Sequence, residues 1–453
     1  MNKSLLLTEG DINISDERRK WDEKITDPQT LQILENDARY FLHQSMSTPC
    51  LDVLKTSKGS GMETLSGRYL LDFHGNNVHQ LGHGNDYIIS QIFEQMQQLS
   101  FSPRRYTNQP AVAFARKLAE LMPGDLNRSL FAPGGTSVIG IALKLARVVT
   151  GKHKIVSHWD SFHGASLDAI SAGGESVFKK YMGPMMPGVI CIPPPTTYRG
   201  IFGETEDDQL NYADFLEYVI KKEGDVGAFL VETIRNTDVQ IPTKAYWQRV
   251  REICRNHGVL LILDEIPIAL GRTGKMFAFE NFGIEPDILC LGKGLGGGII
   301  PFAAMIARDS YNVAGDVSLG HYTHEKSPLG SVAALATINY IEKEDLLQKV
   351  FDDGIWMQTE LNKLKERFPL IGDIRGLGLL WGIELVKDRA TKEKATNEAE
   401  QIMYGCMHHG LSFKVSQGNV LQLSPALTIS REDLHTAISV LSEVFEIHAR
   451  QIN

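Results

Sequence analysis

The stretch LILDE, residues 261–265, is an apolar run that ends in two acidic side chains. A second apolar run, LCL at 289–291, is followed by Gly292, Lys293 and Gly294. Such short runs predict buried strands, each of which ends beside a charged residue. Because the carboxyl ends of parallel strands meet at one edge of a sheet, we expect Asp264 and Lys293 to face one cleft.

Strand and helix patterns alternate before this stretch, with functional side chains placed where strands end. The predicted strands span residues 69–73, 129–133, 154–157 and 226–231, and the predicted helices span residues 111–121, 138–149 and 244–256. Glu232 follows one strand, and Gly258 is placed to end the third helix. This alternation is typical of an open, mostly parallel α/β sheet.

The pattern changes after Pro328. A long helix is predicted to begin over residues 331–341, followed by a turn at 373–378 and a strand at 379–385. Ser430 and Asp433 have the spacing of a capping box that starts a final amphipathic helix. We therefore predict three segments: an N-terminal arm, 1–65, a large domain, 66–330, and a small α+β domain, 331–453. The arm contains amphipathic helical pieces such as 27–43 and is expected to join the small domain.

The composition is that of an ordinary globular protein with room for two domains. Of 453 residues, 43% are hydrophobic and 22% charged, and the net charge of −9 argues against a nucleic-acid or anionic membrane surface. No run approaches the roughly 18 apolar residues of a membrane span, and the N-terminus lacks a signal-peptide core. Five widely spaced cysteines favour a reducing compartment, so we expect a cytoplasmic protein.

Gly134, Gly135, Thr136 and Ser137 follow a predicted strand and precede a predicted helix. A turn of this kind presents free backbone N–H groups, two hydroxyls and the positive end of a helix dipole, which together suit a phosphate. An ordinary Thr or Ser helix cap is the alternative. No Gly-Lys-Ser/Thr follows, so the turn is not a P-loop.

The polar loop 74–85 contains two histidines, His79 and His83, four residues apart. That spacing suits metal ligands on a helix, but Gly82 and Gly84 oppose a helix there. No Glu or Cys of the loop completes a ligand set. We therefore expect no metal.

Phe162 lies at a strand exit, where it could stack on a planar ring or serve as ordinary core. A buried carboxylate, a lysine, a phosphate seat and a stacking aromatic are together what pyridoxal 5′-phosphate requires. The lysine forms the Schiff base, and the carboxylate keeps the pyridine nitrogen protonated so that the ring withdraws electrons. The combination is more specific than any of its parts.

The chain resembles the class III (ω-amino acid) aminotransferases over nearly its whole length. The motifs that carry the resemblance are residues 261–265, GRTG at 271–274, PDI at 286–288 and GKGLGGG at 292–298. The resemblance implies a fold type I enzyme that is an obligate homodimer with shared active sites. It also implies the roles of individual residues: Lys293 forms the Schiff base, Asp264 pairs with the pyridinium, Gly135, Thr136 and the partner's Thr323 bind phosphate, Phe162 stacks on the ring, and Glu232 joins the cofactor site.

Departures from the family bear on the reaction. Gln422 occupies the place where these aminotransferases usually carry an Arg for the keto-acid carboxylate, and a neutral amide cannot form that charge-assisted pair. Glu232 is followed by residues 233–237 without the usual second Glu, Pro267 replaces a Gln, and residues 324–328 replace Gly-Gly-Asn-Pro. We interpret these changes as loss of the site for an amino acceptor.

Elimination needs only one substrate, with Lys293 as base and Asp264 holding the electron sink. Residues 133–137, 266–267 and 321–326 resemble those of the ammonia-lyases in this class that act on (R)-2-amino-1-hydroxyethylphosphonate. The resemblance implies release of phosphonoacetaldehyde and ammonia.

A phosphonate requires cationic or multi-donor contacts. The candidate substrate residues are Arg104, Arg105, Tyr106, Arg235, Lys326 and Gln422, and some of the charged ones are expected to be solvated surface groups. Three alternatives stay open: an aminotransferase that binds its acceptor through Arg235, a phospholyase acting on ethanolamine phosphate, and a catalytically idle binding protein.

Overall fold

The computed structural model describes residues 15–44 and 50–452. They divide into two compact units. The large unit comprises Asp86–Asn236 and Gln240–Leu347, and the small unit comprises the described residues up to Asn85, Thr237–Val239 and the residues from Gln348 onward. None of the helices in the described ranges is both long and apolar enough to span a membrane.

The large unit is built on one seven-stranded sheet. In spatial order its strands are β4 (Leu126–Ala132), β10 (Ala303–Arg308), β9 (Ile288–Leu291), β8 (Leu260–Asp264), β7 (Val226–Glu232), β5 (Lys154–His158) and β6 (Val189–Ile192). Strands β9, β8, β7, β5 and β6 pair in parallel, and β10 is antiparallel to both of its neighbours. The predicted α/β class with a mostly parallel sheet is confirmed.

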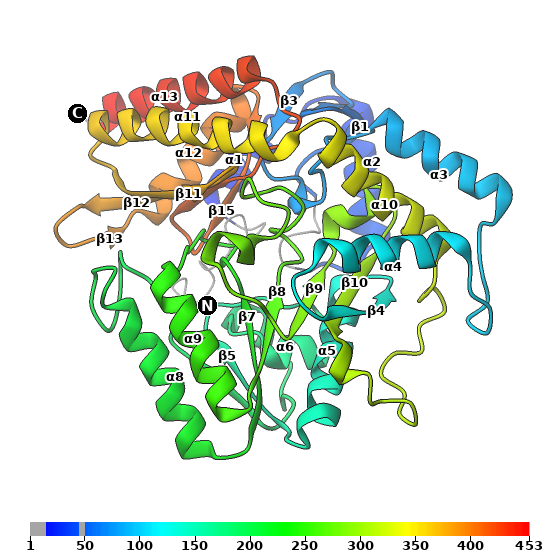
Figure 1. Ribbon diagram of the computed structural model, residues 1–453. Helices are drawn as coiled ribbons and strands as arrows, with labels where there is room; N and C mark the ends of the chain where they lie inside the picture. Colours follow the sequence, from blue (N-terminus) through cyan, green and yellow to red (C-terminus); the bar gives the residue numbers. More distant parts are fainter. Residues whose placement is uncertain (1–14, 45–49, 453) are drawn as a thin grey trace. The chain divides into compact units, whose positions relative to one another are not determined.

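Helices of the large unit pack against this sheet or against one another. They are α3 (Asp86–Gln98), α4 (Gln109–Leu121), α5 (Gly135–Thr150), α6 (Leu167–Ala172), α7 (Ser176–Lys179), α8 (Gln209–Glu223), α9 (Lys244–His257) and α10 (Pro328–Lys343), with 3-10 turns η3 (Ala278–Phe282), η4 (Lys293–Gly296) and η5 (Asp309–Tyr311). The apolar side chains of α5 share one core with those of β8 and β9. Helices α8 and α9 lie side by side (Figure 1). Gly258 ends α9 with a φ of 60°, as predicted.

The small unit contains two sheets whose strands pair antiparallel, except for the parallel pair β3 and β14. One has the order β1 (Leu54–Lys58), β2 (Gly61–Thr64), β3 (Tyr69–Asp72), β14 (Leu411–Ser412), and the other β11 (Ile371–Leu377), β12 (Leu380–Asp388), β16 (Val420–Leu423), β15 (Lys414–Ser416), with β13 (Glu393–Lys394) paired to β12. Its helices are α1 (Asp16–Asp22), α2 (Pro28–Tyr40), α11 (Leu346–Arg367), α12 (Thr396–His408) and α13 (Arg431–Ile452), with the short turn η2 (Gly75–Asn77).

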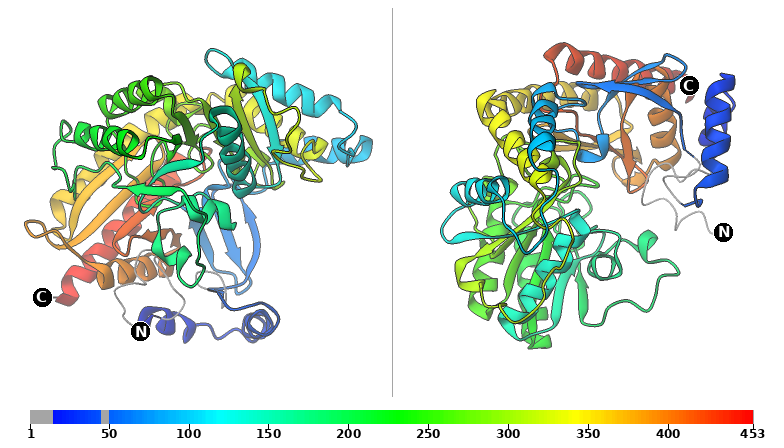
Figure 2. Two further views of the ribbon diagram at one scale, coloured as in Figure 1. Left: turned by 90° about the horizontal axis from the view of Figure 1, so that it is seen from below. Right: turned by 90° about the vertical axis from the view of Figure 1, so that its right-hand side faces the viewer.

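Helices α11 and α13 run side by side (Figure 2). Phe368, directly after α11, stacks on Phe445 of α13 with ring centroids 5.3 Å apart, and Trp356 meets His435 edge to face at 4.5 Å. The backbone N–H of Asp433 donates to Ser430 Oγ at 2.9 Å, which confirms the predicted cap of α13.

One segment differs from the sequence-based expectation. The predicted turn at 373–378 is wrong for most of its length, because residues 371–377 form β11 and pair with β12 along their whole length. The glycines that favoured a turn are accommodated inside this hairpin, whose tight corner follows Leu377.

The compact units divide after Asn85 and after Leu347, whereas the sequence placed segment boundaries at 65/66 and 330/331. The predicted domain boundaries stay a prediction. Helices α3 and α10 pack on each other within the large unit. A Cβ on Gly297 would come within 2.5 Å of Ile88 in α3, and one on Gly330 in α10 within 2.3 Å of Phe302. This close packing holds both helices to the segment between Lys293 and β10.

Candidate active site

Asp264 is the last residue of β8, and its carboxylate is fixed by two donors. His163 Nδ1 lies 2.8 Å from Asp264 Oδ2, and the Ile266 backbone N–H donates to Oδ1 at 3.0 Å. Asp264 is 2% exposed and the His163 side chain is fully buried, with its Nε2 3.4 Å from Ser157 Oγ. A buried carboxylate held in this way has a defined orientation toward a ligand.

The role of His163 was missed in the sequence. The signal present there was a His-Gly pair after Phe162 at the exit of a strand, but the separation of 101 positions between His163 and Asp264 hides their contact.

Lys293 follows β9, the parallel neighbour of β8. Asp264 pairs with Cys290, so Lys293 lies three residues beyond the partner of Asp264 at the same sheet edge. Lys293 is half-buried and starts η4 with a φ of 47°, in the left-handed region. A non-glycine residue in that region is uncommon and such residues concentrate at functional sites. The predicted delivery of Asp264 and Lys293 to one edge is confirmed for the two strands.

The N-terminus of α5 has the features expected of a phosphate seat. Its N-cap, Gly134, provides no side-chain hydrogen bond to the first turn, where the Ser137 N–H donates to the Gly134 carbonyl and the preceding N–H groups of Gly135 and Thr136 lie at the open end of the helix. Thr136 Oγ1 lies 2.6 Å from Ser166 Oγ and accepts the Ser166 backbone N–H at 3.1 Å. A Cβ on Gly164 would come within 2.6 Å of Thr136, so only glycine permits this approach.

One side chain joins the seat to the lysine loop. A Cβ on Gly135 would come within 3.0 Å of Ile266 Cδ1, and a Cβ on Gly292 within 3.1 Å of Ile266 Cγ2. Ile266 therefore lies against both glycines while its own N–H holds Asp264. The phosphate seat, the carboxylate and the start of the Lys293 loop surround one side chain.

Phe162 and Glu232 lie beside this arrangement. Phe162 is half-buried, with its ring 4.6 Å from that of Phe178, and its backbone N–H donates to Glu232 Oε1 at 3.2 Å. Asn236 N–H donates to Glu232 Oε2 at 3.0 Å. Burial raises the pKa of Glu232, and the negative charge of Asp264 raises it further, while His163 opposes the rise.

The candidate substrate residues fall into three places. Arg104 contacts His321, with the two guanidinium nitrogens 2.5 and 2.7 Å from the ring nitrogens, and the neighbouring Arg105 and Tyr106 are exposed. The exposed Lys326 lies in the same loop as His321, and its carbonyl accepts from Asn108 at 2.9 Å. Residues 104–108 and 321–326, which include the exposed Thr323, are thus joined to each other.

Arg235 is buried at 9% exposed, and its guanidinium lies 3.6 Å from Asp160. Gln422 belongs to the small unit, where it is buried on β16 opposite Gly382 and Lys414. The substrate roles of all these residues stay predictions.

The donor set suits pyridoxal 5′-phosphate. An uncapped helix N-terminus with a threonine hydroxyl fits the phosphate, a buried carboxylate fits the pyridinium, and a lysine lies at the same edge. The chain belongs to the class-III aminotransferase family, whose model matches residues 43–445. Its cofactor is pyridoxal 5′-phosphate, as predicted.

Individual relatives cover nearly the whole chain. The chain is similar to the (R)-1-hydroxy-2-aminoethylphosphonate ammonia-lyase of Vibrio splendidus (strain 12B01), with 56% identity over 451 residues that cover 96% of this chain and 94% of the relative. It is 35% identical to the leucine/methionine racemase of Thermococcus litoralis, over 90% of this chain and 94% of that one. A thermostable (S)-enantioselective omega-transaminase from Thermomicrobium roseum has a similar structure, with a TM-score of 0.86 and 28% identity over 92% and 98% of the two chains.

Proposed function

We propose that this chain is a pyridoxal-phosphate-dependent ammonia-lyase that converts (R)-2-amino-1-hydroxyethylphosphonate into phosphonoacetaldehyde and ammonia. The observation that carries the proposal is 56% identity over nearly the full length to an ammonia-lyase for this aminophosphonate. Gln422, in the place of the usual acceptor-binding Arg, supports it from the residues. The atoms balance, because the water lost with the hydroxyl group is regained when the enamine is hydrolysed.

The residues of the site divide the work. When bound, pyridoxal phosphate supplies the electron sink for the charge left by removing a proton beside the amine. Lys293 holds the cofactor and removes that proton. Asp264, kept in place by His163 and Ile266, holds the pyridine nitrogen protonated. The N-terminus of α5 and Thr136 hold the phosphate.

The phosphonate is bound, in this proposal, by cationic side chains of the two joined loops. Arg104, Arg105 and Lys326 are the candidates there, and Arg235 is a buried candidate.

The protein acts as a homodimer in which the partner's Thr323 loop completes each site. Five free cysteines among the described residues support a cytoplasmic location.

Incubation of the purified holoenzyme with the aminophosphonate alone tests the reaction. We expect ammonia and phosphonoacetaldehyde in equal amounts over many turnovers, with no keto acid added. A strict requirement for pyruvate or 2-oxoglutarate would instead establish the aminotransferase alternative, which the family as a whole favours. Release of inorganic phosphate from ethanolamine phosphate would identify a phospholyase.

Lys293→Ala is the matched control for the cofactor. We expect this variant to lose both turnover and the visible absorbance of lysine-bound pyridoxal phosphate. Retention of that absorbance would contradict the assignment of Lys293.

A further inference from the structure

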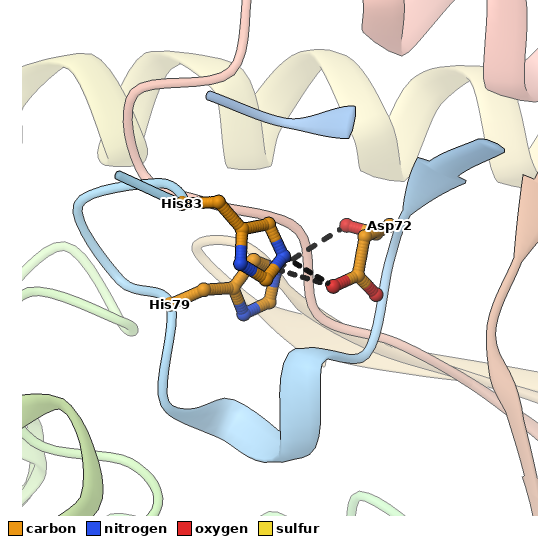
Figure 3. A group of neighbouring side chains, drawn as sticks. All are labelled: Asp72, His79 and His83. Carbon is orange, nitrogen blue, oxygen red and sulfur yellow. Dashed lines mark hydrogen bonds and ion pairs between the residues drawn. The ribbon is translucent and has the colours of Figure 1, made fainter. Parts of the chain in front are cut away.

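Three potential metal ligands converge in the small unit, one at the end of β3 and two in the loop that follows it (Figure 3). Asp72 Oδ2 lies 2.8 Å from His83 Nε2 and 3.8 Å from His79 Nε2. Donor atoms of the three side chains all lie within 4.8 Å of one another, and no second group of three or more such side chains occurs within residues 15–44 and 50–452. Asp72 supplies the member that the loop sequence lacked.

The two imidazoles are held by their surroundings. Their rings stack with centroids 5.1 Å apart and planes at 27°. Both Nε2 atoms lie on the Asp72 side of the rings, and that of His79 also lies 3.3 Å from the Asp72 backbone carbonyl oxygen. His79 packs against the backbone of Gly75, where a Cβ would come within 2.0 Å of its Nδ1. His83 is fixed by two backbone hydrogen bonds with Gly59, at 2.8 and 2.9 Å.

The carboxylate is oriented as well. Asp72 is 2% exposed, and its Oδ1 accepts the backbone N–H groups of His74 and Gly75 at 3.0 and 2.8 Å. Its own N–H donates to Ser60 at 2.8 Å. Oδ1 is therefore occupied by the backbone, while Oδ2 points to the histidines. Ligating carboxylates are commonly held by such second contacts.

The donor types favour a particular class of ion. Two imidazole nitrogens and one carboxylate oxygen suit zinc and similar divalent transition metals, whereas magnesium and calcium prefer all-oxygen sites. Zinc lies about 2.0 to 2.2 Å from such ligands, which places the donors of a tetrahedral site roughly 3.3 to 3.6 Å apart. The observed 2.8 and 3.8 Å lie on either side of that range, so small shifts bring the donors into place.

We propose that Asp72, His79 and His83 bind one divalent transition metal ion of the zinc class, with a fourth position left for water. The ion ties the end of β3 to the loop 79–83 within the small unit. This site is separate from the predicted lyase chemistry and stands independently of it, because none of its ligands belongs to the cofactor-binding set.

Metal content of the purified holoenzyme tests the proposal. The protein is treated with a chelator, returned to metal-free buffer, supplied with zinc and passed through a desalting column, and bound zinc is measured by inductively coupled plasma mass spectrometry. We expect one zinc per chain, retained in excess magnesium. We expect loss of that zinc in His79→Ala and in His83→Ala, and retention in His409→Ala, which changes a partly exposed histidine of the same unit.

The absorbance of bound pyridoxal phosphate reports on folding in every variant. If His79→Ala loses that absorbance, His79→Gln, which keeps side-chain size and polarity, takes its place. Wild-type protein with no more zinc than the His79 variant, or full zinc in both histidine variants, would overturn the proposal. Displacement of zinc by magnesium would also overturn it, because two imidazoles and one carboxylate should prefer zinc to magnesium.

Discussion

The position of the Asp264 carboxylate depends on buried neighbouring side chains, among them histidines that follow β5 or end it. His163 contacts its carboxylate, and the buried His158 ends β5 five residues before His163. The Nε2 atom of His158 is 3.3 Å from the Tyr246 hydroxyl, and its ring meets Phe229 edge to face at 5.2 Å. Burial, together with smaller contributions from the neighbouring Arg235 and His163, lowers the pKa of His158 to about 3.

The pKa of His158 predicts a loss of stability in mild acid. Above its ordinary pKa of 6.5, His158 is neutral in both the folded and the unfolded chain. As the pH falls below 6.5, the unfolded chain takes up a proton that the folded chain refuses until about pH 3. The free energy of unfolding therefore falls by up to about 1.4 kcal/mol for each pH unit in that window.

Urea denaturation at pH 7.5 and 5.5 measures this effect. We expect His158→Gln to reduce the difference in unfolding free energy between the two pH values by about 1.4 kcal/mol. His153→Gln is the control, because the His153 side chain is 62% exposed, and it should keep the wild-type difference. An unchanged difference in His158→Gln would show that the histidine is protonated in the folded protein.

At the level of elements, α5 has glycines near both ends that do different work. At its N-terminus, Gly164 has a φ of 131° and lies against Thr136, in the phosphate seat. At its C-terminus, Gly151 has a φ of 65° and ends the helix, with no atom within 4 Å of a Cβ placed there. One glycine permits a close approach, and the other permits only a left-handed turn.

Alanine at these two positions should separate cofactor binding from stability. Gly164→Ala must displace Thr136, so we expect pyridoxal phosphate to bind at least about tenfold more weakly, a loss of roughly 1.4 kcal/mol. Gly151→Ala should cost about 1 kcal/mol of stability with unchanged cofactor affinity. Fluorescence titration of the apoprotein with cofactor, together with thermal unfolding, measures both effects. Equal cofactor affinities in the two variants would argue against the phosphate seat.

At the scale of the whole molecule, an exposed apolar face on α3 supports the proposed homodimer. Ile89, Phe93 and Met96 follow one another at helical spacing and are 44%, 59% and 54% exposed. The following segment adds Leu99, Phe101 and Tyr106, each also exposed. Exposed apolar side chains at helical spacing are typical of a surface that another subunit covers. It continues into the loop that carries Arg104 and Arg105.

Phe93→Asp should disrupt the proposed homodimer. A carboxylate placed in an apolar interface loses its hydration without gaining a partner, so we expect a shift toward monomer and weaker cofactor retention. Sedimentation velocity across a concentration series measures the shift. Tyr218→Asp is the control, because Tyr218 is a 56% exposed aromatic residue on α8. A variant that sediments like the wild type would place the interface elsewhere.

The sequence alone determined the class of fold and the two strands that bring Asp264 and Lys293 to one sheet edge. Strands β7, β8 and β9 are buried on both faces, so their residues form continuous apolar runs that mark both the strand and the charged residue after it. The end of α9 at Gly258 and the cap at Ser430 were equally local features. Gln422 was singled out by its position in the resemblance to this class, and its role stays a prediction.

Only the tertiary structure decided which distant residues meet. His163 reaches Asp264 across 101 positions, Ile266 lies against both Gly135 and Gly292, and Asp72 completes a donor set with His79 and His83. The hairpin of β11 and β12 was missed for the same reason, since glycines inside a strand resemble a turn until the partner strand is present. Periodicity records how each segment faces the core, but strand order and backbone pairing determine which side chains become neighbours.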